Sequence, residues 1–141
     1  MKKRKSKFTP GAFALRPKHS SAGLGLFTFS PIKKGQCVVE YVGRRISQAE
    51  EYTSRSLYLF EVTSKITIDG RARSNIARYI NHSCMANCEI NIHKHRVYVF
   101  AKQNIKEGEE LTYNYDKDYF DEYLKGKCRC PKCLAKRALS K

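Results

Sequence analysis

The sequence lacks any apolar run of about 18 residues, the shortest stretch that spans a lipid bilayer as a helix. It also lacks an apolar segment behind its basic N-terminus, so a secretory signal peptide is not predicted. The 141 residues, 41% of them hydrophobic, match the usual size of one domain and supply enough apolar side chains for one core. We therefore expect a soluble protein with no membrane contact.

Acidic residues are absent from both ends of the chain, since all 13 lie between Glu40 and Glu122. Five of the first seven residues are basic, and seven more basic residues lie from Lys125 to Lys141. The segment between these arms holds 16 basic against 13 acidic residues and is nearly balanced. Basic arms on a balanced core are typical of proteins that contact nucleic acid. The alternatives are solubility and, for the first seven residues, a nuclear-import signal.

Strand-forming residues dominate the middle of the chain. Runs rich in β-branched and aromatic residues cover residues 26–29, 37–42, 57–62, 88–92, 96–101 and 110–115. Gly35 and Gly108 each follow an Ile-Lys-x sequence, which predicts the same turn before two strands. His93-Lys94-His95 is expected to close a hairpin rather than supply ligands, and Ile68-Asp69-Gly70 is expected to form a turn.

Helix signals are few and short. Ser47 followed by Glu50 is a capping box for a helix that ends near Arg55. A second short helix is predicted over residues 75–80, with Ser74 as its N-cap. These helices are too few for a doubly wound parallel sheet, so the predicted fold is mainly β with short helices.

Two segments combine several side-chain chemistries where core packing would use aliphatic residues. One is Arg-Tyr-Ile-Asn-His-Ser-Cys from Arg78 to Cys84, and the other is Glu-Leu-Thr-Tyr-Asn-Tyr from Glu110 to Tyr115. Together they resemble the signature segments of SET-domain protein-lysine methyltransferases, and the resemblance covers roughly residues 11–134. It implies a fold of small curved β-sheets with a threaded C-terminal segment. It also implies methyl transfer from S-adenosylmethionine to a lysine side chain.

The resemblance extends to a glycine-spaced loop at Gly23-Leu24-Gly25. Such a loop is weak evidence alone, but in the family its lack of side chains lets the backbone approach the cofactor. In the family the Asn of the Asn-His pair contacts the amino-acid end of the cofactor, and the backbone of the His meets the adenine. An Arg or Tyr just upstream supports the loop. The resemblance thus assigns the cofactor site to Gly23, Leu24, Gly25, Arg78, Tyr79, Asn81 and His82.

Three tyrosines are the predicted catalytic residues. By resemblance, the Tyr115 hydroxyl lies where the lysine nitrogen meets the methyl donor, and Tyr41 walls the lysine channel. Tyr113 lies two residues before Tyr115, so both side chains face one side of an extended strand. A Tyr at this position in the family favours monomethylation, although Tyr113 serving only as channel wall is the alternative. Gly43 is followed by Arg44 where the family has an acid, which departs from its usual peptide-docking edge.

The cysteines near the C-terminus predict a metal site. Cys128, Cys130 and Cys133 pack three thiols into six residues, which suits zinc better than mutual disulfides. By resemblance, the fourth ligand is Cys84, although the family usually has four residues between the last two tail cysteines and this chain has two. A redox pair of Cys130 and Cys133 is the alternative.

The other two cysteines, Cys37 and Cys88, are expected to be inert core thiols because they lie in apolar strands. Unpaired thiols and thiolate-bound zinc imply a reducing intracellular compartment, either the nucleus and chromatin of a eukaryote or a cytoplasm.

These patterns divide the chain into a basic arm (1–10), a SET domain (11–122) and a zinc-binding post-SET tail (123–141). The predicted function is methylation, mainly monomethylation, of a lysine in a basic protein such as a histone or another DNA-associated protein. The acids Asp116, Asp118, Asp121 and Glu122 would attract that substrate, while the arms would hold nucleic acid. The alternatives are an inactive SET-derived module and a zinc-ribbon module, each binding nucleic acid or chromatin. No oligomeric state is predicted.

Overall fold

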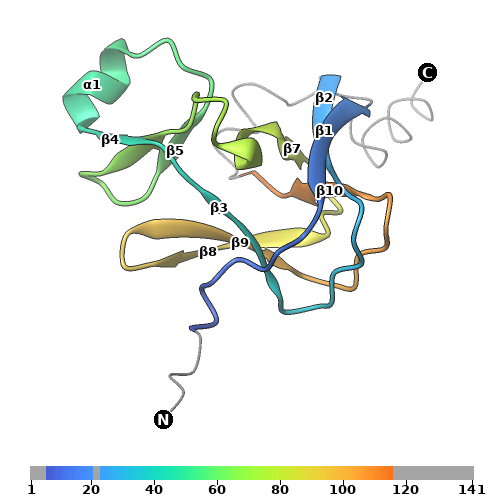
Figure 1. Ribbon diagram of the computed structural model, residues 1–141. Helices are drawn as coiled ribbons and strands as arrows, with labels where there is room; N and C mark the ends of the chain where they lie inside the picture. The colour runs from blue at the N-terminus through green and yellow to red at the C-terminus, as the bar shows by residue number, and fades with distance from the viewer. Residues whose placement is uncertain (1–5, 21–22, 116–141) are drawn as a thin grey trace.

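A computed structural model of the chain describes residues 6–20 and 23–115, which form two β-sheets with one short α-helix (Figure 1). The larger sheet has seven strands in the order β1-β2-β10-β8-β9-β3, with β7 beside β10. Its strands are β1 (Leu15–Ser20), β2 (Gly23–Thr28), β3 (Cys37–Tyr41), β7 (Asn81–His82), β8 (Cys88–His93), β9 (Arg96–Ala101) and β10 (Glu110–Tyr113). The predicted mainly-β fold is therefore confirmed.

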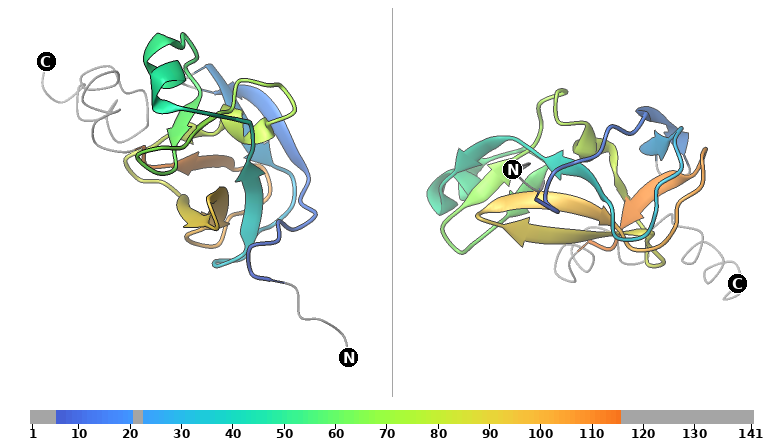
Figure 2. Two further views of the ribbon diagram at one scale, coloured as in Figure 1. Left: turned by 90° about the vertical axis from the view of Figure 1, so that its left-hand side faces the viewer. Right: turned by 60° about the horizontal axis from the view of Figure 1, so that its bottom comes forward.

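The smaller sheet has three antiparallel strands in the order β4-β6-β5. They are β4 (Arg44–Ile46), β5 (Leu59–Glu61) and β6 (Thr67–Asp69). Helix α1 (Gln48–Thr53) joins β4 to β5, and this unit lies at the opposite end of the molecule from β1 and β2 in Figure 1 and in the right-hand view of Figure 2. The turn predicted at Ile68-Asp69-Gly70 is wrong, because β6 is the central strand of this sheet.

The apolar core belongs mostly to the larger sheet. Alternation along β2, β9 and β10 places aliphatic side chains on the inner face, where water is excluded. The most deeply buried of these side chains are those of Leu26, Val97, Val99 and Leu111. Within the described ranges, no helix is long and apolar enough to cross a membrane.

Two similar turns lie side by side beneath the core. Gly35 and Gly108 have φ angles of 89° and 90°, a region that glycine enters without steric cost. Ile32 and Ile105, three residues before each glycine, form reciprocal backbone hydrogen bonds of 2.9 and 2.8 Å. The repeated turn predicted from the sequence is confirmed, as is the β8–β9 hairpin.

The two predicted helices have different outcomes. Helix α1 begins as predicted, with the Glu50 amide donating to the Ser47 hydroxyl at 3.2 Å. The second helix is the 3₁₀ helix η1 (Ile76–Tyr79), and its N-cap is Asn75, so the predicted cap at Ser74 is wrong. The Asn75 side chain makes no capping bond because it is used elsewhere, as described below.

Candidate active site

A cavity of about 710 Å³ is lined by residues of both sheets. The larger sheet contributes residues of β2, β3, β7, β8 and β10, the smaller sheet contributes residues of β5, and η1 also lines the cavity. Seven of the predicted site residues line this cavity, namely Leu24, Tyr41, Arg78, Tyr79, Asn81, Tyr113 and Tyr115. Residues far apart in the sequence therefore meet at one cavity.

The Asn81 side chain joins the glycine loop to β10. Its Nδ2 donates to the backbone oxygen of Leu24 at 2.9 Å, to the Glu110 carboxylate at 3.1 Å and to the Ser20 hydroxyl at 3.3 Å. Gly25 permits this approach, since a Cβ at that position would collide with the Glu110 carboxylate. The Oδ1 of Asn81 has no hydrogen-bond partner within the part of the chain that the structure describes, so it can accept a hydrogen bond from a ligand. The role of Glu110 here is not evident from the sequence.

Gly23 begins β2 in the left-handed region with a φ of 94°. L side chains rarely adopt this conformation, so the loop geometry favours glycine here even though a Cβ would meet no neighbour.

The His82 ring ties Tyr115 to the Asn81–Cys84 segment. Its Nδ1 accepts a hydrogen bond from the Tyr115 amide at 3.0 Å, and its Nε2 lies 3.2 Å from the Cys84 sulfur. Because Nδ1 is an acceptor, the ring proton belongs on Nε2. Burial lowers the pKa of His82, which favours this neutral form.

The three predicted catalytic tyrosines have well-defined positions. The Tyr115 hydroxyl donates to the Ile80 carbonyl at 2.8 Å, and the Tyr41 hydroxyl donates to the Tyr58 carbonyl at 2.7 Å. The rings of Tyr113 and Tyr115 lie 4.7 Å apart between centroids, and both line the cavity. An aromatic wall with two fixed hydroxyls results.

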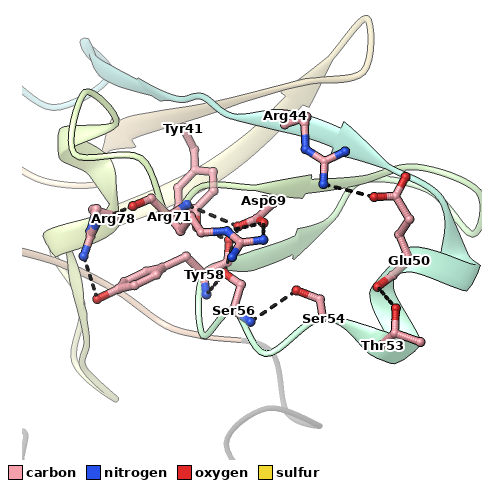
Figure 3. A network of polar contacts seen from close by, with 10 residues as sticks. All are labelled: Tyr41, Arg44, Glu50, Thr53, Ser54, Ser56, Tyr58, Asp69, Arg71 and Arg78. Atoms are coloured by element: carbon pink, nitrogen blue, oxygen red, sulfur yellow. Dashed lines mark hydrogen bonds and ion pairs between the residues drawn. The ribbon is translucent and has the colours of Figure 1, made fainter.

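The wall formed by the smaller sheet is held by a polar network (Figure 3). The buried Asp69 carboxylate accepts from Ser56 at 2.8 Å and from Arg71 Nε at 2.7 Å. Burial alone would raise the pKa of this carboxyl, but the hydrogen bonds from Ser56 and Arg71 outweigh it and hold the pKa below its usual value. The carboxylate is therefore charged at neutral pH.

Asn75 connects this wall to Val42, the residue that follows β3. The residue is only 1% exposed, and its Oδ1 accepts from the Val42 amide while its Nδ2 donates to the Gly70 carbonyl. A Cβ at Gly70 would collide with both Asn75 and the Tyr41 ring. The sequence places Asn75 only at the start of the predicted second helix, and nothing in it indicates the contacts of this side chain.

The predicted zinc site falls mostly outside the described residues, since only Cys84 belongs to them. Residues 6–20 and 23–115 contain no cluster of three metal-ligating side chains. The acids from Asp116 to Glu122, the basic tail and residues 1–5 also lie outside the description. Cys37 and Cys88 are buried as predicted, and burial raises the pKa of their thiols to about 11 and about 12.

Comparison with known proteins gives a consistent result. The SET domain family matches residues 23–116. Histone-lysine N-methyltransferase trithorax of Drosophila virilis is 36% identical over 124 aligned positions, covering 79% of this chain and 3% of that protein. Histone-lysine N-methyltransferase trr of Drosophila melanogaster is 35% identical over 146 positions, covering 94% of this chain and 6% of that protein.

A third relative is the histone-lysine N-methyltransferase, H3 lysine-4 specific, of Schizosaccharomyces pombe, which is 34% identical over 78% of this chain and 13% of its own length. The chain thus spans a small fraction of the length of these relatives. The family match and the shared motifs lead to one conclusion, which is that the chain belongs to the SET-domain family.

Proposed function

We propose that the chain transfers a methyl group from S-adenosylmethionine to a lysine of a basic protein such as a histone. The observation that carries this proposal is that Asn81 and Leu24 of the glycine loop line the same cavity as Tyr41, Tyr113 and Tyr115. Relatives named histone-lysine N-methyltransferases support the lysine and histone assignment, and with it a role at chromatin.

The residues around Asn81 fit the methyl donor. The amide oxygen of Asn81 can accept from an ammonium group, and the absence of a side chain at Gly25 keeps the neighbouring backbone accessible. Gly23, Leu24 and His82 complete the proposed cofactor site. When bound, S-adenosylmethionine supplies a methyl group on a sulfonium, which is a good leaving group.

Tyr41 and Tyr115 would orient the lysine amine. Each hydroxyl donates its hydrogen to a backbone carbonyl, so its oxygen presents lone pairs to an amine N–H. The lysine must react as the neutral amine, and its deprotonation near neutral pH costs about 4 kcal/mol. The aromatic wall lowers this cost by disfavouring the ammonium form, and the proton is lost to bulk water.

A substitution at Tyr115 tests the proposal. Tyr115→Phe should retain affinity for S-adenosylmethionine and lower the turnover by about 100-fold, because the amine loses its alignment. Transfer of labelled methyl groups to core histones and calorimetry of cofactor binding measure the two quantities. Tyr52→Phe is the matched control, since Tyr52 lies on α1 and is 82% exposed. A Tyr115→Phe variant as active as its parent would refute the role.

The number of methyl groups added would depend on Tyr113. Its hydroxyl can hold a water that occupies the space of a second methyl group, and displacing that water costs on the order of 1 kcal/mol. Mass spectrometry of a peptide at long reaction times should show mainly one methyl group, and Tyr113→Phe should move the distribution upward. Trimethylation as the main product of the parent would contradict this.

A structural zinc ion would be held by Cys84 with Cys128, Cys130 and Cys133. Cys84 is half-buried, and its sulfur lies 3.2 Å from His82 Nε2. A thiol in this position suits a zinc ion that is shared with the three cysteines of the C-terminal tail. Elemental analysis of protein prepared under reducing, chelator-free conditions should give one zinc per chain. A metal-free preparation that remains active would oppose the assignment.

The basic arms would contact nucleic acid near the substrate, while the acids from Asp116 to Glu122 attract the basic peptide. Affinity for DNA should then fall steeply as the salt concentration rises. Binding that does not change with salt would oppose this electrostatic model.

A further inference from the structure

Arg78 lies in η1, three residues before Asn81, but its guanidinium reaches the smaller sheet (Figure 3). Nη2 lies 3.3 Å from the Tyr58 hydroxyl, and Nη1 donates to the Arg71 carbonyl. The guanidinium is 4.3 Å from the Tyr58 ring centroid and 5.1 Å from that of Tyr79. Arg78 therefore connects η1 with residues that flank the strands of the smaller sheet.

The partners of Arg78 are themselves fixed. Arg71 is held by an ion pair with the buried Asp69, with an N–O distance of 2.6 Å. Asp69 also accepts from Ser56, whose hydroxyl accepts from the Tyr58 amide at 3.1 Å. These contacts form a closed ring. It runs from Arg78 to Arg71, Asp69, Ser56 and Tyr58, and the contact between the Tyr58 hydroxyl and Arg78 closes it.

Tyr58 is the link between this ring and the proposed lysine channel. Its carbonyl accepts from the Tyr41 hydroxyl at 2.7 Å and from the Gly70 amide at 2.8 Å. A shift of Tyr58 would therefore move the acceptor that orients the Tyr41 hydroxyl. The Nε of Arg78 is buried without a hydrogen-bond partner among the described residues, so the guanidinium is held by its two outer nitrogens and by stacking.

We propose that Arg78 is a positioning residue that fixes the substrate-side wall of the cavity, rather than a cofactor-binding residue. It does so by holding Tyr58, and through it Tyr41, against the segment that carries Asn81. The assignment of this wall to the substrate rests on the proposed function. The tie, by which we mean the contacts of Arg78 with Tyr58 and Arg71, does not. A planar fork that stacks and donates twice is needed, which lysine cannot supply.

The tie is tested by hydrogen exchange and calorimetry on the full chain. Arg78→Met should raise the exchange rates of the Tyr58 and Gly70 amides by about 10-fold, because their local opening becomes easier. Its affinity for S-adenosylhomocysteine should stay within about 2-fold of the parent, which is the range expected for a residue outside the cofactor contacts. Arg44→Met is the matched control, since it removes a guanidinium of β4 in the smaller sheet that makes only a peripheral ion pair with Glu50.

Activity supplies the second readout. Arg78→Met should raise the KM for a histone peptide by about 10-fold and change the KM for S-adenosylmethionine little, because only the substrate wall is loosened. Arg78→Lys should resemble Arg78→Met. A merely structural role would lower activity through loss of folded protein, with both KM values unchanged.

Three outcomes would overturn the inference. If Arg78→Met lost affinity for S-adenosylhomocysteine while its amide exchange rates stayed unchanged, Arg78 would be a cofactor contact. If neither the affinity nor the exchange rates changed, Arg78 would have no positioning role. Full function in Arg78→Lys would show that only charge matters. If Arg78→Met fails to fold, Tyr58→Phe, which removes only the hydroxyl facing Nη2, must still speed exchange at Gly70 relative to Arg44→Met. A parent chain that binds no S-adenosylhomocysteine would refute the proposed function, while the exchange data would still decide the tie.

Discussion

The two sheets are stabilised in different ways. The larger sheet buries aliphatic side chains along β2, β9 and β10, and apolar side chains predominate among its most enclosed residues, although Thr28 of β2 is polar and 0% exposed. In the central strand of the smaller sheet, β6, all three residues are buried but two of them, Thr67 and Asp69, are polar. Hydrogen bonds and an ion pair thus stabilise the centre of the smaller sheet, whereas apolar packing stabilises the larger sheet.

This difference coincides with a division of the cavity. The cofactor residues proposed around Asn81 lie on strands of the apolar sheet, and the opposite wall comes from the polar sheet. Apolar burial depends weakly on pH, whereas a network built on a carboxylate requires that group to be charged. The proposed substrate side is therefore the more easily altered by a single polar substitution or by acid.

Removing apolar volume from the larger sheet should have the largest effect on stability. Leu111 in β10 is 0% exposed, and Leu111→Ala should lower the free energy of unfolding by about 3 kcal/mol through lost burial and a cavity. Denaturant titration measures the change. Leu57→Ala, at a side chain 72% exposed, should change it by less than about 0.5 kcal/mol. A cost below that of the polar substitutions that follow would break the comparison.

Removing the charge at the centre of the smaller sheet should cost less. Asp69→Asn weakens the bonds from Ser56 and Arg71 and should lower the free energy of unfolding by about 2 kcal/mol. Glu89→Gln, at an exposed residue of β8, is the control and should change little. If Asp69→Asn and Glu89→Gln lowered the free energy of unfolding by the same amount, the network around Asp69 would add no stability.

The same variant sharpens the comparison through pH. Because the pKa of Asp69 is lower in the folded than in the unfolded chain, its contribution is complete above the unfolded value of about 3.9 and is lost as the pH falls through the folded value. The stability difference between parent and Asp69→Asn should be constant from neutral pH to about pH 4 and should shrink below it. A difference that grows under acid would reverse the assigned sign.

The same contrast explains what the sequence could predict. Runs rich in β-branched and aromatic residues revealed most strands of the larger sheet, with β1 and β7 missed. The motifs at Asn81 and Tyr115 identified the family and many of the cavity residues. The smaller sheet was only partly predicted, since β6 carries polar side chains that are buried by tertiary hydrogen bonds, and a short polar segment with a glycine looks like a turn. Tyr58 and Asn75 were missed because their contacts join segments 17 to 33 residues apart.

Helix α1 gives a smaller test of local stabilisation in this unit. Ser47→Ala removes the acceptor for the Glu50 amide and should cost about 1 kcal/mol, seen mainly as faster exchange of the Glu50 and Glu51 amides. Ser47→Asp should restore protection because Asp is also a strong N-cap. If Ser47→Ala destabilised the whole chain as much as Leu111→Ala, α1 would have to be part of the main folding unit.

The smallest effect is expected at Arg44, which stands where the family has an acid. Its guanidinium pairs with Glu50 of α1 at 3.0 Å, and the two side chains are 64% and 51% exposed. Solvent and salt screen such a pair, so Arg44→Met should change the free energy of unfolding by less than about 0.5 kcal/mol. A double-mutant cycle with Glu50→Gln, measured at low and high salt, isolates the coupling energy. A coupling above about 1 kcal/mol that persists in high salt would place this pair in the buried network, and the charge reversal at Arg44 would then be a structural element of the substrate wall.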